Sequence, residues 1–160
     1  MTTAINPQIF REYDIRGIVG KDLTPETVQL IGQAIGTYLT RQGGRSLIIG
    51  WDVRSSSVEF RDILSNALNS TGCDIIDIGR VPTPVSYFAI HHFKADGGVM
   101  ITGSHNPPEF NGFKISQGQS SLYGSKIQDL KNLINSKDFE IGSGKIEQRS
   151  VLDAYVKHIC

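Results

Sequence analysis

The chain has 160 residues, of which 39% are apolar and 20% are charged, as in an ordinary globular domain. Sixteen Lys and Arg residues balance sixteen Asp and Glu residues, and neither sign forms a long block. A nucleic-acid-binding surface needs a sustained basic field, so nucleic acid is not an expected partner.

Targeting signals and cysteine chemistry are both unremarkable in this sequence. Residues 1–10 hold no basic segment followed by an apolar core, so no signal peptide is expected. No apolar stretch approaches membrane-spanning length, and no membrane partner is expected. Cys73 and Cys160 lack metal-ligand spacing, and we expect free thiols in a reducing compartment. Together these features predict a cytoplasmic protein.

The first half of the chain alternates helical and extended patterns. Thr24 is the expected N-cap of a helix over residues 25–42, which begins with proline and ends at a glycine pair. Residues 47–50 are an apolar run typical of a buried strand. A second helix is expected from the serines near residue 55 to about residue 72.

The second half of the chain continues the alternation. The expected segments are a strand at 73–78, a short helix at 82–93, a strand at 98–102, an extended segment at 113–115 and a late amphipathic helix containing Ile127, Leu130 and Ile134. This order predicts an α/β fold in three layers, α/β/α, around a mixed, mostly parallel sheet.

Polar clusters follow three of the predicted strands, at residues 51–54, 80–84 and 103–107. Ligands of open α/β sheets gather at the carboxyl ends of the strands. The three clusters therefore predict a binding site at one edge of the sheet.

The C-terminal part of the chain has a different character. Residues 136–148 are polar and contain glycines, which predicts a surface turn or hairpin. Residues 151–159 begin a new apolar pattern that has no helix-ending signal. We expect residues 1–150 to form one domain, and residues 151–160 to start a linker or helix that leads to a second domain outside this chain.

The segment around Ser104 carries the chemistry. A strand delivers Ser104 to a tight loop, and Asn111-Gly112 is typical of a turn that would bring Lys114 back toward it. The serine hydroxyl, the His105 imidazole, the Asn106 amide and the lysine ammonium would then share one small volume. Such a set suits phosphoryl transfer, which needs an accepting oxygen, a proton shuttle and cations.

Two other interpretations of this loop compete with phosphoryl transfer. Polar turns rich in Ser, Asn, Pro and Gly are common between strands, and a purely structural turn remains open. A serine hydrolase needs a base facing the serine and an acid behind that base, which consecutive Ser104, His105 and Asn106 do not easily supply. The segment also lacks the Gly-x-Ser-x-Gly pattern of a nucleophile elbow.

The sequence resembles the α-D-phosphohexomutase superfamily, most closely the N-terminal domain of its bacterial phosphomannomutase/phosphoglucomutase branch. Thr-Gly-Ser-His-Asn-Pro at 102–107 is similar to the active-site serine loop of that family. Phe-Arg-Glu-Tyr-Asp-Ile-Arg-Gly at 10–17 is similar to its N-terminal signature. The segments 50–54, 81–84 and 111–114 follow in the expected order.

The resemblance implies a reversible transfer of phosphate between C1 and C6 of a mannose or glucose phosphate, through a bisphosphorylated sugar. Ser104 would carry the phosphate in the resting enzyme. A magnesium ion would bind one oxygen of that phosphoserine, and hexose 1,6-bisphosphate would act as activator.

The resemblance also implies roles for individual residues near the serine. The catalytic set would be Ser104, His105, Lys114 and Arg16. The substrate-binding set would be Tyr13, Arg16, Ser104, His105, Asn106 and Lys114. Asp52 and Arg54 are expected to form a structural ion pair under the loop, with direct substrate contact as the alternative.

The family pattern includes three further domains, which would be partners of this one. They carry a magnesium-binding Asp-x-Asp-x-Asp loop, sugar-reading residues and a phosphate-binding loop, and no such Asp motif occurs here. The chain by itself is therefore expected to be inactive on a hexose phosphate substrate. A phosphoglucosamine-type mutase domain and a non-catalytic sugar-phosphate-binding module remain as alternatives.

Overall fold

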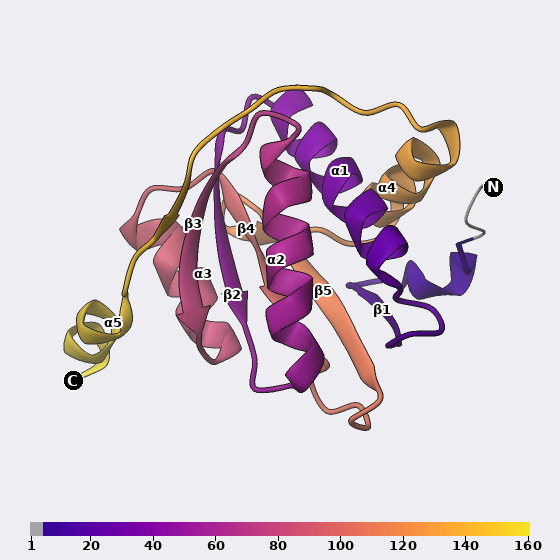
Figure 1. Cartoon of the computed structure of the whole chain (residues 1–160). Coiled ribbons are helices and arrows are strands. Elements are labelled where there is room, and N and C mark those ends of the chain that lie inside the picture. The colour runs from indigo at the N-terminus through magenta and orange to yellow at the C-terminus, as the bar shows by residue number, and fades with distance from the viewer. Residues whose placement is uncertain (1–4) are drawn as a thin grey trace.

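A mixed sheet forms the middle layer of the computed structural model, which describes residues 5–160 (Figure 1). Its strands are β1 (Ile15–Ile18), β2 (Ser46–Trp51), β3 (Asp74–Arg80), β4 (Gly97–Ile101), β5 (Phe110–Gln117), β6 (Ser120–Ser121) and β7 (Ile146–Gln148). Their order is β1-β5-β4-β2-β3-β7, and β6 pairs with β5. β4, β2, β3 and β7 run parallel, whereas β5 is antiparallel to both of its long neighbours.

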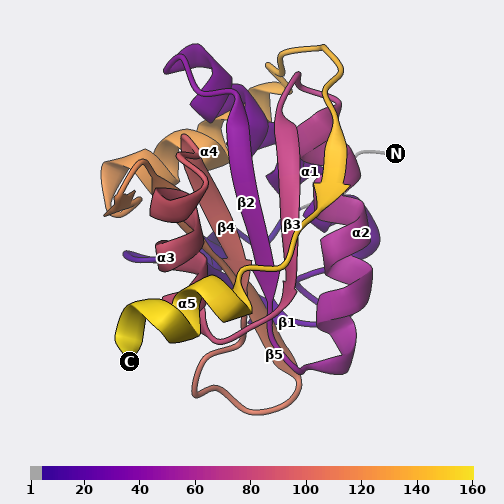
Figure 2. The same cartoon turned by 90° about the vertical axis from the view of Figure 1, so that its left-hand side faces the viewer.

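Helices cover both faces of this sheet. They are α1 (Pro25–Arg41), α2 (Ser55–Asn69), α3 (Thr83–His92), α4 (Ser125–Ser136) and α5 (Leu152–Ile159), with a short 3-10 helix at Pro7–Ile9. The helices α1, α2 and α4 share one apolar core, and α3 and α5 belong to another on the opposite face. Figure 2 shows α2 and α3 on opposite sides of the strands. The predicted three-layer α/β/α fold is confirmed.

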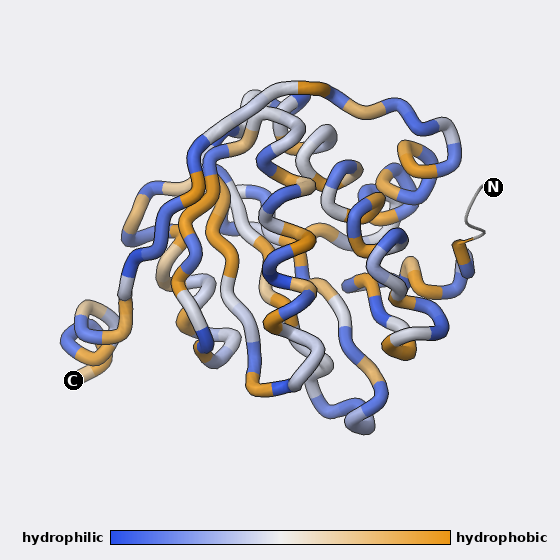
Figure 3. The backbone as a smooth tube through the Cα atoms, viewed as in Figure 1, coloured by the Kyte–Doolittle hydropathy of each residue, from blue (hydrophilic) through white to orange (hydrophobic). Residues whose placement is uncertain are grey.

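Apolar side chains fill the two spaces between the layers. In the larger core, the rings of Phe60 on α2 and Phe113 on β5 lie 5.9 Å apart. In the smaller core, Val85 and Ile90 of α3 pack in one cluster with Ile48 of β2. Figure 3 shows the apolar segments concentrated along the central strands. Burial on both faces explains why these strands are continuous apolar runs in the sequence.

The first helix starts where the sequence predicts. The Thr24 hydroxyl accepts a hydrogen bond from the Thr27 amide at 3.2 Å, and proline occupies the first turn. The helix ends at Arg41, just before Gly43, whose φ is +88°. Gly43 reaches this left-handed angle without the steric cost that a side chain would bring.

The predicted turn at Asn111-Gly112 is wrong. Both residues lie inside β5, and residues 102–109 reverse the chain instead. Gly112 pairs with Arg16 of β1, and a Cβ at this glycine would collide with the Ile15 carbonyl oxygen. The dipeptide therefore serves a close approach between two strands and not a turn.

For residues 136–148 the predicted surface position is right, but the predicted local hairpin is wrong. The chain leaves α4 and passes over the end of α1 to the far edge of the sheet, where β7 pairs in parallel with β3 (Figure 1). Arg41 holds this crossing segment through ion pairs with Asp138 and Glu140, each at 2.9 Å. Without β7, the main-chain groups along this edge of β3 would lack partners. Pairing with β3 and the two ion pairs therefore favour the long connection instead of a local hairpin.

The remaining sequence predictions concern the chain end, cysteines and membrane segments. Helix α5 packs partly against α3 and leaves Leu152, Val156 and Ile159 exposed. Cys73 is buried, Cys160 is exposed, and both are free thiols. Among residues 5–160, none of the helices is long and apolar enough to span a bilayer.

Candidate functional site

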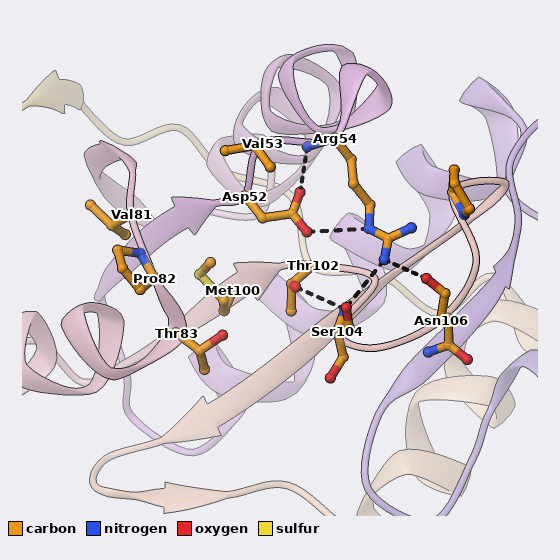
Figure 4. A pocket seen from close by; sticks show the side chains of 11 residues that line it. Asp52, Val53, Arg54, Val81, Pro82, Thr83, Met100, Thr102, Ser104 and Asn106 are labelled. Atoms are coloured by element: carbon orange, nitrogen blue, oxygen red, sulfur yellow. Dashed lines mark hydrogen bonds and ion pairs between the residues drawn. The ribbon is translucent and has the colours of Figure 1, made fainter.

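Three loops meet at the carboxyl ends of β2, β3 and β4 and enclose a cavity of about 460 Å³ (Figure 4). They are the loops that the polar clusters in the sequence predicted. The polar residues that line the cavity are Asp52, Arg54, Thr83, Thr102, Ser104 and Asn106. The apolar ones are Val53, Val81, Pro82, Met100 and Pro108. The lining of the cavity thus combines polar side chains, most of them from the loops after β2 and β4, with apolar ones.

Ser104 lies at the exposed tip of its loop, with its backbone in the left-handed region at a φ of +54°. Its amide donates a hydrogen bond to the Thr102 hydroxyl at 3.0 Å. The serine hydroxyl projects away from Arg54 (Figure 4). A strained backbone that presents one hydroxyl at a cavity is typical of functional sites.

Arg54 lies beneath the serine loop and binds its main chain. The guanidinium Nε lies 3.4 Å from the Asp52 carboxylate, so the expected ion pair is present. The two terminal nitrogens donate to the carbonyl oxygens of Ser104 (3.2 Å), Asn106 (2.7 Å), Pro107 (2.7 Å) and Phe110 (2.9 Å).

Asp52 supports the loop from the other side. Its carboxylate accepts hydrogen bonds from the Ser57 hydroxyl at 2.6 Å and from the Arg54 and Gly103 amides at 3.0 and 3.1 Å. Burial of this carboxyl opposes ionisation, but the hydrogen bonds, that of Ser57 foremost, outweigh burial and lower the pKa of Asp52. The group is therefore an anion that faces Arg54 at neutral pH.

Gly103 and Asn106 complete the local frame. A Cβ at Gly103 would overlap the Arg54 guanidinium, so only glycine permits this stacking. The Asn106 side-chain amide donates to the Gly103 carbonyl at 2.8 Å, which closes the turn. Its carbonyl oxygen accepts from Arg16 at 3.4 Å, which links the loop to β1.

The structure places the predicted site residues in two groups. Ser104 and Asn106 line the cavity, and Arg16 reaches Asn106 while it also pairs with Asp14 at 2.8 Å. In the described part of the chain, the cavity lining does not include His105, Lys114 or Tyr13. His105 is exposed beside the serine, Lys114 lies on β5 opposite Met100, and Tyr13 is 71% exposed.

The described residues do not by themselves fit a magnesium ion. Within residues 5–160, no group of three or more His, Cys, Asp or Glu side chains could hold a metal ion. The acidic side chain at the cavity, Asp52, already has both oxygens engaged by hydrogen bonds. Magnesium requires several hard oxygen ligands, and here only a phosphorylated Ser104 would add one.

Residues 7–141 match the family model for phosphoglucomutase/phosphomannomutase, alpha/beta/alpha domain I. The fold, the serine loop and this match together define a domain of the sugar-phosphate mutase class. The chain belongs to the phosphoglucomutase/phosphomannomutase family and corresponds to its first domain.

Individual relatives agree with this assignment. The phosphomannomutase/phosphoglucomutase of Pseudomonas aeruginosa is 44% identical over 163 residues, which cover 99% of this chain and 35% of the relative. The phosphoglucomutase of Neisseria meningitidis serogroup B is 39% identical, covering 98% and 34%. The crystal structure of a phosphoglucomutase/phosphomannomutase family protein from Burkholderia thailandensis superposes with a TM-score of 0.92 at 40% identity, covering 98% and 36%. The chain thus spans about a third of the length of these relatives.

Proposed function

We propose that Ser104 is the phosphoryl carrier of a mutase that interconverts the 1-phosphate and 6-phosphate of mannose or glucose. The observation that carries this proposal is the exposed, left-handed Ser104 held at a cavity by Arg54, in a chain of this family. A serine phosphoester suits the task because it is stable until an acceptor is positioned against it.

The transfer would proceed as a displacement at phosphorus. The bond between phosphorus and Ser104 Oγ breaks while a sugar hydroxyl oxygen forms its own bond to phosphorus. The proton of that hydroxyl passes to a nearby base, for which we propose His105, the exposed neighbour of the serine, and the leaving Ser104 oxygen takes up a proton to become a hydroxyl again. The bisphosphorylated sugar then reorients and returns its other phosphate to Ser104.

Arg16 and Lys114 are proposed to stabilise the moving phosphate. Paired residues on neighbouring strands direct their side chains to the same sheet face. Arg16 pairs with Gly112 and Lys114 pairs with Met100, so both cations share the face on which Met100 lines the cavity. The planar fork of an arginine fits phosphate oxygens.

Asn106 and Tyr13 are proposed substrate contacts. Asn106 lines the cavity beside the serine, and Tyr13 is strongly exposed just before β1. Tyr13 would meet the sugar only if the substrate extends beyond the cavity along β1. A cytoplasmic location for the enzyme stays a prediction.

The rest of the site would come from outside this chain. We propose that three further domains of a longer protein supply the sugar-reading residues and the carboxylate ligands of a magnesium ion, which would offset phosphate charge. Hexose 1,6-bisphosphate would serve as the activator that phosphorylates Ser104. The chain alone is expected to turn over nothing.

A coupled mutase assay on the longer protein tests this function. The assay compares Ser104→Ala with the control Ser120→Ala, which removes another exposed serine hydroxyl. With glucose 1-phosphate and mannose 1-phosphate as substrates, we expect activity to fall to background in Ser104→Ala and to persist in the control. Retained activity in Ser104→Ala would refute the proposal. Activity on amino-sugar phosphates alone would move it to the phosphoglucosamine branch.

A further inference from the structure

We infer that Arg54 is the positioning residue of the serine loop: it sets the place and direction of the Ser104 hydroxyl without touching substrate. This inference rests on the proposed function, because it concerns the same serine. The hydrogen bonds of Arg54 bridge four carbonyl groups that span the whole loop, from Ser104 to Phe110.

The donors of Arg54 are fully used within the protein. A guanidinium has five N–H groups. Four of them meet the loop carbonyls and the fifth, on Nε, faces the Asp52 carboxylate. No donor is left for a phosphate, so Arg54 acts on the reaction through the loop and not through direct contact.

A buried chain of hydrogen bonds fixes Arg54 in turn. The fully buried Asn111 donates through its side-chain nitrogen to the Ser57 hydroxyl at 3.0 Å, and that hydroxyl donates to Asp52 at 2.6 Å. The Asp52 carboxylate also accepts hydrogen bonds from the backbone amides of Arg54 and Gly103. The loop is thereby tied to the start of α2 and to β5, two rigid elements.

We therefore expect the conformation of the loop to depend on the planar set of guanidinium donors of Arg54 and not on its positive charge. Lysine keeps the charge and can keep the ion pair with Asp52, but one ammonium group does not reach four carbonyls in a planar arrangement. Arg54→Lys should therefore loosen the loop while the rest of the domain stays folded. Arg61→Lys is a matched control, because Arg61 lies on α2, the helix that Arg54 precedes, and pairs with Asp77, away from the loop.

Hydrogen exchange on this chain tests the positioning role directly. The amides of Asn106 and Phe110 are bonded within the loop, each at 3.0 Å to a carbonyl oxygen. Arg54→Lys should accelerate their exchange about tenfold, as the loss of a hydrogen bond to a charged group would. Arg61→Lys should leave them unchanged. Equal exchange in the two variants would overturn the inference.

Kinetics of the longer protein give a second readout. A displaced serine should lower kcat about 100-fold and change KM little, because misplacement by about 1 Å affects the reacting geometry more than binding. Added guanidinium ion should restore part of the kcat of Arg54→Ala. A raised KM with unchanged kcat would instead make Arg54 a substrate contact and would contradict the inference.

Gly103→Ala keeps the test decisive if the Arg54 variants do not fold. Its Cβ would displace the guanidinium without removing it, and loop exchange should rise as in Arg54→Lys. The two proposals fail separately. Full activity in Ser104→Ala refutes the proposed function, whereas unchanged loop exchange in both Arg54→Lys and Gly103→Ala refutes the role of Arg54 alone.

Discussion

Ser104 holds a backbone angle that most side chains avoid. In the described residues, three non-glycine residues have positive φ: Lys94, Ser104 and Lys137. Lys94 lies two residues after the end of α3 and Lys137 directly follows α4, positions where a left-handed residue commonly ends a helix. Ser104 follows no helix, so its strain belongs to the loop that presents the hydroxyl.

Glycine at this position should therefore relieve strain. We expect Ser104→Gly to raise the free energy of unfolding by up to about 1 kcal/mol, because a left-handed non-glycine residue costs about 1–2 kcal/mol and glycine adds chain entropy. Urea unfolding measures the change. Ser120→Gly, at an exposed strand residue without positive φ, should lower the free energy of unfolding by about 0.5–1 kcal/mol. A loss of stability in Ser104→Gly similar to that in Ser120→Gly would contradict this account.

The Asp52 carboxyl should respond to its hydroxyl partner. Ser57→Ala removes the strongest hydrogen bond to it and should raise the pKa of Asp52, since burial then opposes ionisation with less compensation. Carbon-13 titration of the carboxyl measures this pKa. Ser56→Ala is the control, because the Ser56 hydroxyl accepts from Asn111 instead. An equal pKa of Asp52 in both variants would be evidence against the described network.

The pH dependence of stability follows with a definite sign. A carboxyl whose folded pKa lies below its unfolded pKa stabilises the fold above the unfolded value, and this stability is lost as pH falls through the folded pKa. The contribution of Asp52 is thus present at neutral pH and lost under acid conditions. Ser57→Ala should move the acid loss of stability to higher pH.

At the residue scale, the sequence predicted which side chains belong to the site better than it predicted the contacts that hold them in place. Ser104 and Asn106 were predicted as site residues from a polar loop after a strand, and both line the cavity. The four carbonyl contacts of Arg54 were not predicted, since backbone acceptors leave no mark on residue identity. For Asp52 and Arg54 the sequence suggested an ion pair or a direct substrate contact, and the ion pair is present.

At the element scale, the helices α1 and α2 approach each other through glycines. A Cβ at Gly32 would lie 2.6 Å from the Ala67 Cβ and 3.3 Å from Leu64. A Cβ at Gly36 would collide with the Thr71 hydroxyl. The spacing of four residues places both glycines on one helix face.

The packing of α1 on α2 gives a prediction against helix propensity. Alanine is the better helix former by about 1 kcal/mol, yet Gly32→Ala should lower the free energy of unfolding by about 1–3 kcal/mol through overpacking. Urea unfolding checks the sign. A second substitution, Ala67→Gly, should recover part of the lost free energy of unfolding, because it removes the methyl group that the new Cβ meets. A stabilised Gly32→Ala would show that the helices can separate freely.

Element boundaries were predicted well where local signals act alone. The Thr24 cap and the Gly43 stop define α1 without help from the rest of the chain. The prediction failed where tertiary contacts compete with local preference. Asn111-Gly112 has the composition of a turn, but buried hydroxyl partners and the neighbouring β1 strand hold it extended.

At the scale of the whole molecule, the chain is a complete α/β/α layer structure that spans about a third of its relatives. Two apolar cores lie on opposite faces of one sheet, so we expect the chain to unfold in a single cooperative transition in urea. Circular dichroism and tryptophan fluorescence should give coincident curves. Two separated transitions would show that the two cores are not one folding unit.

The central claim is that Ser104 carries the phosphoryl group, and phosphate mapping tests it most directly. The longer protein would be incubated with hexose 1,6-bisphosphate and magnesium, then digested and sequenced by tandem mass spectrometry. The account predicts one phosphoryl group on the peptide that contains Ser104, and none on that peptide in Ser104→Ala. Phosphate on another residue, or an unmodified Ser104 in protein that is active as a mutase, would contradict it.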